Sequence, residues 1–306
     1  MRTAFVNALY ELAVRDPRIV LLTGDLGFSV LEPFRDNLPA QYVNAGVAEQ
    51  NMTSIAVGMA LSGKIAFTYS IANFPTLRCL EQVRNDVCYH EANVKIVAVG
   101  GGFAYGAAGA SHHATEELGV MRLMPNLTVV APADPVEARA AAAALVEHRG
   151  PCYVRLGKAG EPTLHQGEID FRLGCALRVR DGRDLTLIST GSMLKAALGV
   201  AARLAERSVE ARVLSMHTLK PLDEEAVLAA ARDTGTILTL EQHSVLGGLG
   251  GAVAELLAES GIPVRFRRVG LPSAFSPAVG SQEWLERQHG LDEESILGAT
   301  LKLLPS

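Results

Sequence analysis

The chain has 306 residues, of which 48% are hydrophobic and 20% are charged. This composition, with 29 glycines spread along the chain, is typical of a globular α/β protein and excludes a disordered or fibrous one. The formal net charge is -5 with both signs interspersed, so the sequence lacks the basic stripe that binds a nucleic-acid backbone.

No segment has the pattern of a targeting signal or a membrane span. The N-terminal stretch MRTAFVNALYELAVRD has helical spacing of apolar and charged residues, unlike a secretory signal. No apolar run approaches the roughly 18 residues that a membrane-spanning helix needs. The four cysteines form neither a CxxC pair nor a metal-ligand spacing with histidine, which is typical of reduced thiols. The sequence predicts a cytoplasmic protein with no membrane partner and no metal site of its own.

Short Val- and Ile-rich runs alternate with longer segments of helical periodicity in the first half of the chain. The predicted strands are residues 18–25, 41–46, 64–70, 94–102, 127–134 and 152–157. The predicted helices are residues 47–61, 75–91 and 135–148, the last with Asp134 as N-cap and Pro135 in its first turn. Continuous apolar strands that alternate with helices predict a parallel sheet covered on both faces.

The alternation stops in a polar, Gly-containing stretch and then resumes. Later strands are predicted at 184–192, 210–219, 236–242 and 262–270, and helices at 194–207, 223–232 and after residue 250. The sequence therefore predicts an α/β protein of two domains, each a mainly parallel sheet covered by helices. The first domain is residues 1–160, the linker is 161–183 and the second domain is 184–306.

Glu49 lies in NAGVAEQNM, between a predicted strand and a predicted helix. A glutamate in the first turn of a helix is ordinary, because it interacts favourably with the helix dipole and the unpaired N–H groups. Small residues such as Gly46, Ala48 and Gly58 would let a flat group or another subunit approach the backbone closely. No lysine or arginine lies nearby in the sequence to neutralise this carboxylate.

Several segments in order resemble one family. GVAEQNMTSIAVGMALSG is similar to the Gly-x-x-Glu segment of the pyrimidine-binding domain in transketolases and deoxyxylulose-phosphate synthases, which use thiamine diphosphate. FTYSIANFPTLRCLEQVRND, GAAGASHHATEE, APADPVEA and GPCYVRLGK resemble the segments that follow in that domain. MHTLKPLD and EQHSVLGGLGG are similar to the family's C-terminal domain. On these motifs the chain is identified as a member of the transketolase family over nearly its full length.

The resemblance implies where the cofactor ring lies. Glu49 would be catalytic: it would hydrogen-bond a ring nitrogen of the aminopyrimidine of thiamine diphosphate and handle a proton there. Phe74 is the expected stacking residue and Tyr69 a second candidate, although on residue type alone Phe74 is equally a core residue. Ile71 lies where the family often has a second aromatic side chain, so this part of the wall is predicted to be aliphatic.

The resemblance also implies substrate contacts. His112 and His113 lie in a Gly-rich loop after a strand, where ligands bind in open α/β sheets, and His112 would help to move protons on the substrate. Arg155 would hold a substrate phosphate through its fork of donors. Arg78, one helical turn after Phe74, would face the same cleft, although an interface or surface ion pair is its more ordinary role.

The sequence departs from the family at two substrate positions. Ala108 replaces an aspartate that reads a sugar hydroxyl in many transketolases, and Gly100 replaces a histidine. The identity of the donor and acceptor sugars is therefore open, and a modified ketose phosphate is as compatible with the sequence as xylulose 5-phosphate.

One domain of the family is missing. The family binds the diphosphate and Mg²⁺ through Gly-Asp-Gly and a later asparagine on a separate N-terminal domain, whereas Asp25 in TGDLGF lacks the second glycine. The resemblance thus implies the C-terminal subunit of a split transketolase that transfers a two-carbon ketol unit between sugar phosphates. An N-terminal partner subunit would hold most of the thiamine diphosphate and Mg²⁺, and the pair would assemble as α2β2.

Three alternatives remain open from the sequence. The beta subunit of a 2-oxo acid dehydrogenase has the same two-domain plan, a deoxyxylulose-phosphate synthase shares the motifs, and a non-catalytic assembly partner would retain the fold. GGLGGAVAELL partly imitates a dinucleotide fingerprint, but no acidic residue follows at the spacing that this fold needs. We therefore expect its glycines, with Glu241 and His243, to serve packing.

Overall fold

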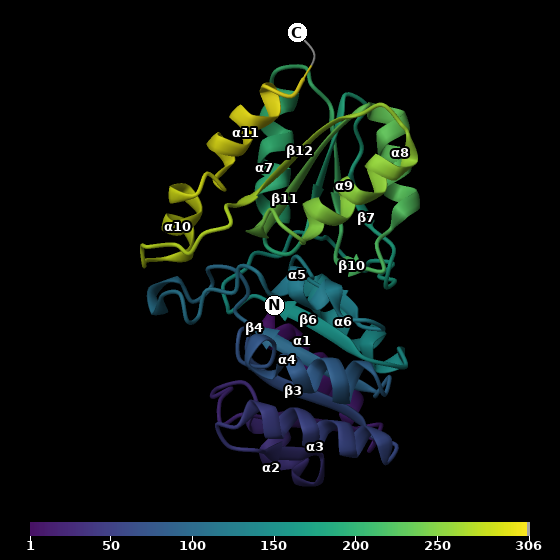
Figure 1. Cartoon of the computed structure of the whole chain (residues 1–306), viewed down its shortest axis with the longest axis vertical. Helices are drawn as coiled ribbons and strands as arrows, with labels where there is room; N and C mark the ends of the chain where they lie inside the picture. The colour runs from purple at the N-terminus through teal and green to yellow at the C-terminus, as the bar shows by residue number, and fades with distance from the viewer. Residues whose placement is uncertain (305–306) are drawn as a thin grey trace.

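The computed structural model describes residues 1–304 as two sheets in tandem (Figure 1). The first sheet has seven strands in the order β10-β5-β6-β4-β3-β1-β2, and the second has five in the order β12-β11-β8-β9-β7. No helix within residues 1–304 is long and apolar enough to cross a membrane.

The first sheet is parallel except for β10. Its parallel strands are β1 (Ile19–Thr23), β2 (Tyr42–Asn44), β3 (Ile65–Ile71), β4 (Val94–Val99), β5 (Thr128–Val130) and β6 (Cys152–Leu156). Almost every residue of β1, β3, β4 and β6 is buried, so both faces need a cover of helices. Because these strands are parallel, their carboxyl ends meet at one edge of the sheet, where ligands bind in such folds.

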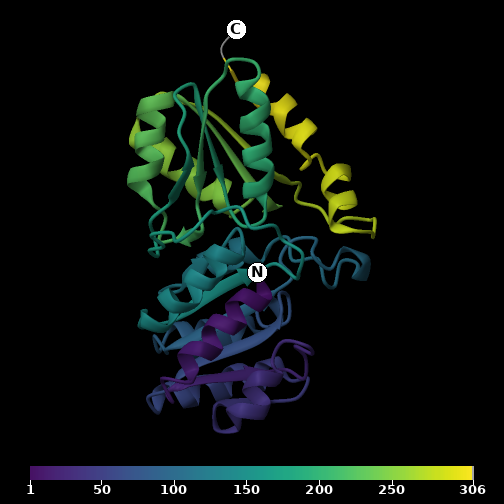
Figure 2. The same ribbon diagram turned by 180° about the vertical axis from the view of Figure 1, so that it is seen from behind.

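Helices cover both faces of the first sheet. On one face lie α1 (Arg2–Ala13) and α6 (Pro135–Glu147), which pack against each other; Figure 2 shows α1 in purple across the near side of the sheet. The opposite face carries α3 (Glu49–Leu61). The remaining elements are α2 (Glu32–Asn37), η1 (Pro39–Gln41), η2 (Leu77–Cys79), α4 (Leu80–Gln82), η3 (Val83–Cys88), η4 (Gly106–Ala108) and α5 (Glu117–Leu123).

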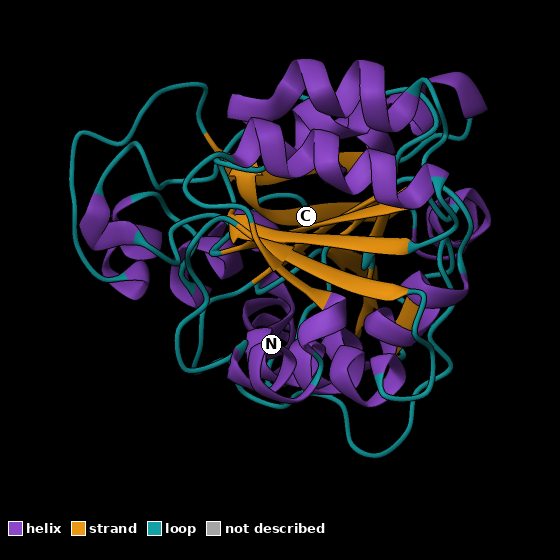
Figure 3. Ribbon diagram, turned by 90° about the horizontal axis from the view of Figure 1, so that it is seen from below, coloured by secondary structure: helices purple, strands orange, loops and turns teal. Residues whose placement is uncertain are grey.

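The second sheet is likewise covered by helices on both faces. Seen from below, the strands of the molecule lie between layers of helices (Figure 3). Its strands are β7 (Leu177–Arg180), β8 (Leu185–Ser189), β9 (Ala211–Ser215), β11 (Thr236–Ser244) and β12 (Arg265–Leu271), and only the β7–β9 pair is antiparallel. Its helices are α7 (Met193–Ala205), α8 (Glu224–Thr234), α9 (Leu249–Ser260), α10 (Gln282–Gln288) and α11 (Glu293–Leu301). The predicted α/β class with two mainly parallel, helix-covered sheets is confirmed.

The structure corrects the predicted strand at 210–219. Residues 211–215 form β9 in the second sheet, whereas β10 (Thr218–Lys220) crosses to the first sheet and pairs antiparallel with β5. The predicted linker, residues 161–183, also contains β7, which belongs to the second sheet. The β10 strand thus connects the two domains where the apolar pattern predicts a single strand, and β7 extends the second sheet where the pattern predicts a linker.

One predicted helix agrees with the structure in detail and another does not. Asp134 caps α6 by accepting from the Glu137 N–H at 2.8 Å, and Pro135 is its first residue, as the sequence predicts. The predicted helix at 75–91 is instead a 3₁₀ turn, one short α-turn and a π-helical segment. The short helices α2, α5, α10 and α11 have no counterpart among the predictions, because six to nine residues carry little periodic signal.

Candidate active site

The carboxylate of Glu49 is buried at the start of α3. Its side chain is 1% exposed, and the Arg78 guanidinium donates from Nη1 to Oε2 at 2.7 Å. The hydroxyl of Ser70, near the end of β3, donates to Oε1 at 3.3 Å. A buried carboxylate is stable only when it is paired and hydrogen-bonded. No cation lies near Glu49 in the sequence, and the fold supplies one, because Arg78 reaches it from 29 residues further along the chain.

Phe74 lies in the turn after β3 and connects Glu49 with the histidine loop. The Arg78 guanidinium carbon lies 4.4 Å from the centre of the Phe74 ring. The His112 ring meets Phe74 edge-to-face with 5.3 Å between centroids. Phe74 is half-buried, so it lines an edge of the domain and is not part of the closed core.

The row continues through two residues that the sequence interpretation missed. The Tyr105 ring lies 6.1 Å from that of His112, and the Lys158 ammonium lies 4.7 Å from the centre of the Tyr105 ring. These side chains follow the carboxyl ends of β3, β4 and β6. We call Glu49, Arg78, Phe74, His112, Tyr105 and Lys158 the active-site row.

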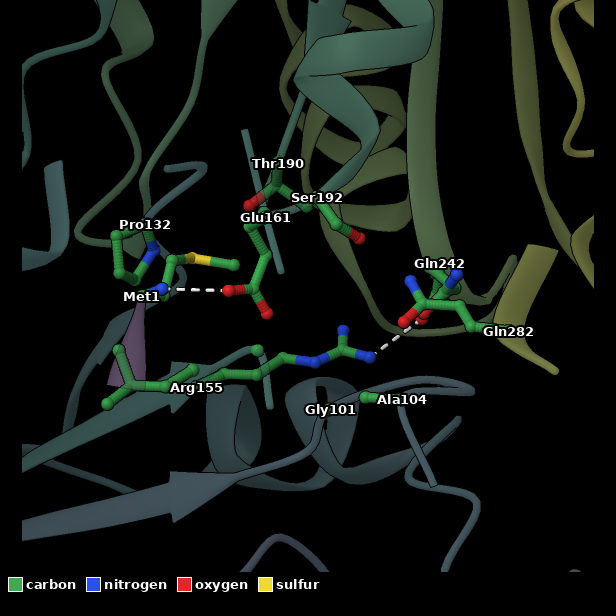
Figure 4. Close-up of a pocket in the computed structure, with 13 residues that line it drawn as sticks. Met1, Gly101, Ala104, Pro132, Arg155, Glu161, Thr190, Ser192, Gln242 and Gln282 are labelled. Atoms are coloured by element: carbon green, nitrogen blue, oxygen red, sulfur yellow. Dashed lines mark hydrogen bonds and ion pairs between the residues drawn. The ribbon is translucent and has the colours of Figure 1, made fainter. Parts of the chain in front are cut away.

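Arg155 is buried between the two domains. Its side chain is 9% exposed, and its Nε lies 3.1 Å from a carboxylate oxygen of the fully buried Glu117. Its Nη2 donates to the carbonyl oxygens of Ala114 at 3.0 Å and Gln242 at 2.8 Å, the second of which Figure 4 shows as a dashed line. Burial raises the pKa of the Glu117 carboxyl, and the adjacent Arg155 charge opposes that rise.

Two family profiles match most of the chain. Residues 1–160 match the pyrimidine binding domain of transketolase, and residues 174–296 match the transketolase C-terminal domain. The chain belongs to the transketolase family. The predicted family is confirmed, and the two matches come in the predicted order.

Relatives of this transketolase chain have nearly the same length. A subunit of the apulose-4-phosphate transketolase of Phocaeicola vulgatus is 41% identical over 99% of this chain and 97% of its own. The 6-deoxy-6-sulfo-D-fructose transketolase subunit SqwH of a Clostridium species is 40% identical over 98% of this chain and 92% of its own. A solved split gene transketolase, described as an inactive beta4 tetramer, superposes with a TM-score of 0.90 at 38% identity, covering 99% of this chain and 97% of the other.

Tyr69 does not reach the site of this transketolase chain. Its side chain is 1% exposed and packs with the core beneath α1 and α6, and burial raises the pKa of its phenol. Successive side chains of a strand point to opposite faces, so Ser70 faces Glu49 while Tyr69 faces away. The prediction of Tyr69 as part of the cofactor wall is wrong.

Ile71 ends β3 and is half-buried. Its carbonyl accepts from the Phe74 N–H at 2.8 Å, so its clear contribution is to shape the turn that carries Phe74. Its role as an aliphatic wall stays a prediction.

The two neighbouring histidines have different surroundings. His113 is 4% exposed, its Nε2 donates to the Gly106 carbonyl at 2.9 Å, and its ring packs edge-to-face on Phe103. It braces the loop from within, contrary to its predicted substrate contact. His112 is half-buried beside Phe74, and its Nδ1 lies 3.0 Å from the Ser111 hydroxyl, so the substrate contact is kept for His112 alone.

Arg155 both joins the domains and lines a pocket. Its guanidinium is held by one buried carboxylate and two carbonyls, and the side chain lines the pocket shown in Figure 4, so its predicted phosphate contact stays a prediction. Lys158 follows three residues later, is exposed and belongs to the active-site row. The sequence signal for Lys158 is its place at the end of GPCYVRLGK, directly after the predicted strand that contains Arg155.

The Gly-rich segment before α9 serves packing, as predicted. Glu241 is fully buried and accepts from the N–H groups of Leu249 and Gly250, both at 2.8 Å. Burial outweighs these hydrogen bonds and raises the pKa of Glu241 to about 7. A Cβ at Gly248 would overlap a carboxylate oxygen of Glu241, so the close approach itself requires glycine.

Proposed function

We propose that this chain is the C-terminal subunit of a two-subunit transketolase, which transfers a two-carbon ketol unit between sugar phosphates with thiamine diphosphate. The observation that carries the proposal is the buried Glu49 carboxylate beside the half-buried Phe74 ring, at the carboxyl edge of a pyrimidine-binding domain. Relatives of equal length that are named as transketolase subunits support the two-subunit arrangement.

The residues present fit an aminopyrimidine ring. A single planar group with N–H donors at its edge, the Arg78 guanidinium, already contacts both the Glu49 carboxylate and the Phe74 face. An aminopyrimidine has the same flat shape and a ring nitrogen that can bond a carboxylate. When bound, thiamine diphosphate supplies the nucleophilic carbon that takes up the ketol unit.

The chain's own residues then have distinct roles. Glu49 holds a proton at the ring nitrogen, and Phe74 orients the ring and keeps water from that contact. His112 moves a proton at a substrate oxygen, and the Lys158 ammonium attracts the distal anionic group of the sugar. Glu49 and His112 are thus the catalytic residues, and Lys158 joins Arg155 as a candidate anion contact.

A partner subunit would complete the site. We infer that an N-terminal subunit carries the Gly-Asp-Gly segment, the Mg²⁺ and the diphosphate site, and that two copies of each chain assemble. Val47 and Ala48, directly before the buried Glu49, are exposed, with Val47 at 74%, so the turn presents apolar surface to such a partner.

Reconstitution tests the proposal. The chain is mixed with a partner that carries Gly-Asp-Gly and a later asparagine, with thiamine diphosphate and Mg²⁺, and ketose phosphate cleavage is measured. Activity should require both chains and should be abolished by Glu49→Ala. Full activity of the isolated chain, or of the Glu49→Ala complex, would refute the proposal. Turnover of pyruvate but no ketose phosphate would favour the 2-oxo acid dehydrogenase alternative.

The sugar itself needs a substrate panel. The two relatives are named for different sugars, one a phosphate and one a sulfonate, and Gly100 and Ala108 remove the usual sequence signals. A panel of ketose phosphates and a sulfonated ketose, assayed with the reconstituted complex, would identify the donor.

A further inference from the structure

The Arg78 guanidinium makes two contacts at once. It donates to Glu49 Oε2 at 2.7 Å, and its central carbon lies over the Phe74 ring, 4.4 Å from the centroid, in a cation–π contact. It therefore meets a buried carboxylate and an aromatic ring at the same time. These are the two contacts that the proposed function assigns to the aminopyrimidine ring.

The guanidinium and the ring compete for the same place. The Arg78 guanidinium donates to Oε2 of Glu49 and its central carbon lies 4.4 Å from the centre of the Phe74 ring, so a ring on the same oxygen and the same aromatic face would overlap it. The Phe74 ring also contacts the His112 ring edge-to-face, with 5.3 Å between centroids. A second flat group can take the position between Glu49 and Phe74 only when the guanidinium leaves it.

Arg78 is placed so that its side chain can leave while its backbone stays. Its side chain is 46% exposed, against 1% for Glu49. Its backbone N–H donates to the Asn73 carbonyl, and its carbonyl accepts from the Gln50 side chain at 3.2 Å. The adjacent Cys79 is buried and donates its thiol to the Phe74 carbonyl. Rotation of the side chain into solvent therefore requires no change in the fold.

The Glu49 carboxylate couples the release of Arg78 to the binding of the aminopyrimidine ring. A carboxylate buried to this degree is strongly destabilised without a donor or counter-charge. Arg78 can leave at little cost only when another N–H group takes its place on Oε2. In the chain alone the guanidinium thus stabilises the ionised carboxylate and keeps Phe74 in its stacking position.

We propose that Arg78 is a stand-in for the aminopyrimidine: it occupies the ring position in the subunit without cofactor and swings out when the ring binds. This inference rests on the proposed function and adds a displacement step to it. When a side chain of the protein fills the site in most molecules, only the remaining fraction can bind ligand. The apparent affinity is then the intrinsic affinity multiplied by that fraction. Removal of the guanidinium should therefore tighten cofactor binding, although it removes a favourable contact.

The test measures binding, not turnover. Thiamine diphosphate with Mg²⁺ is titrated by calorimetry into the reconstituted complex with wild-type chain, Arg78→Met or Arg84→Met. Arg84 is exposed on the same segment and bonds Asn85 but not Glu49, so its substitution removes the same charge without opening the site. Arg78→Met should lower the Kd at least tenfold, and Arg84→Met should leave it unchanged. Arg78→Gln provides a second variant with a smaller change in polarity.

A competition experiment tests the stand-in directly. In an Arg78→Ala complex, added methylguanidinium should raise the apparent Kd for thiamine diphosphate, whereas the wild-type complex should not respond to it. An equal or weaker affinity in both Arg78→Met and Arg78→Gln would overturn the inference. A wild-type complex that binds no thiamine diphosphate would instead refute the proposed function, so the two failures are distinct.

Discussion

The guanidinium of Arg155 and the carboxylate of Glu117 form an ion pair that is almost completely removed from solvent, with Nε and Oε1 3.1 Å apart. Arg155 comes from β6 and Glu117 from the start of α5, and the same guanidinium reaches the carbonyl of Gln242 in β11 of the second sheet. The pair therefore lies where the two domains meet, and it contributes to stability.

Removal of one partner of this pair should strongly destabilise the chain. We expect Arg155→Met to lower the free energy of unfolding by about 3–5 kcal/mol, because it leaves a buried carboxylate uncompensated. Urea denaturation followed by circular dichroism measures this loss. The exposed pair between Arg139 and Glu11 is the matched control, and Arg139→Met should leave the midpoint nearly unchanged. Equal midpoints for the two variants would contradict a structural role for Arg155.

Lys158 should affect substrate affinity. Lys158→Met removes the exposed ammonium of the active-site row and should raise KM for the ketose phosphate about tenfold to a hundredfold, as expected for a charge-assisted hydrogen bond, with a smaller change in kcat. Steady-state kinetics of the reconstituted complex give both constants. Lys64→Met, at the opposite end of β3, is the control and should behave as wild type. An unchanged KM for Lys158→Met would show that Lys158 does not bind the anionic group of the substrate.

His112 should affect the chemical step. His112→Asn removes the proton-moving group beside Phe74 and should lower kcat about 10²–10⁴-fold, the range for loss of general acid–base catalysis. His90→Asn, at an exposed position away from the row, provides the comparison. The buried His113 is a less clean target, because its hydrogen bond to Gly106 shapes the loop and its substitution would also affect folding. Wild-type kcat in His112→Asn would exclude this histidine from catalysis.

Glu241 should make stability fall as pH rises through neutrality. Burial raises the folded-state pKa of its carboxyl from 4.5 to about 7, so the folded state binds the proton more tightly than the unfolded state. The resulting stabilisation is fully present below pH 4.5 and is lost as pH rises through about 7. At most it amounts to about 3 kcal/mol.

Glu241→Gln should flatten this dependence. Melting temperatures between about pH 5 and 8 would decline less in the variant than in the wild-type chain, since the glutamine does not titrate. Glu255→Gln, at an exposed position of α9, should keep the wild-type slope. The prediction fails when all three proteins show the same slope.

Much of the architecture follows from local sequence patterns. Continuous apolar strands between amphipathic segments determine a parallel sheet with two covered faces, and Asp134 with Pro135 marks a helix start correctly. The alternation of side chains along β3 also contains the information that Ser70 and Tyr69 face opposite sides. The short helices and β10 were not predictable in this way, because their formation depends on packing against distant parts of the chain.

The sequence by itself determined the family, the α/β class and the position of Glu49 at a helix start. Only the tertiary structure decided which cation each carboxylate meets: Arg78 for Glu49 and Arg155 for Glu117. It also decided that Lys158 joins the active-site row. The physical reason is the distance along the chain over which each interaction acts. Helix and strand patterns arise from neighbours within a few residues, whereas a buried charge is compensated by whichever side chain the folded sheet brings within about 3 Å of it.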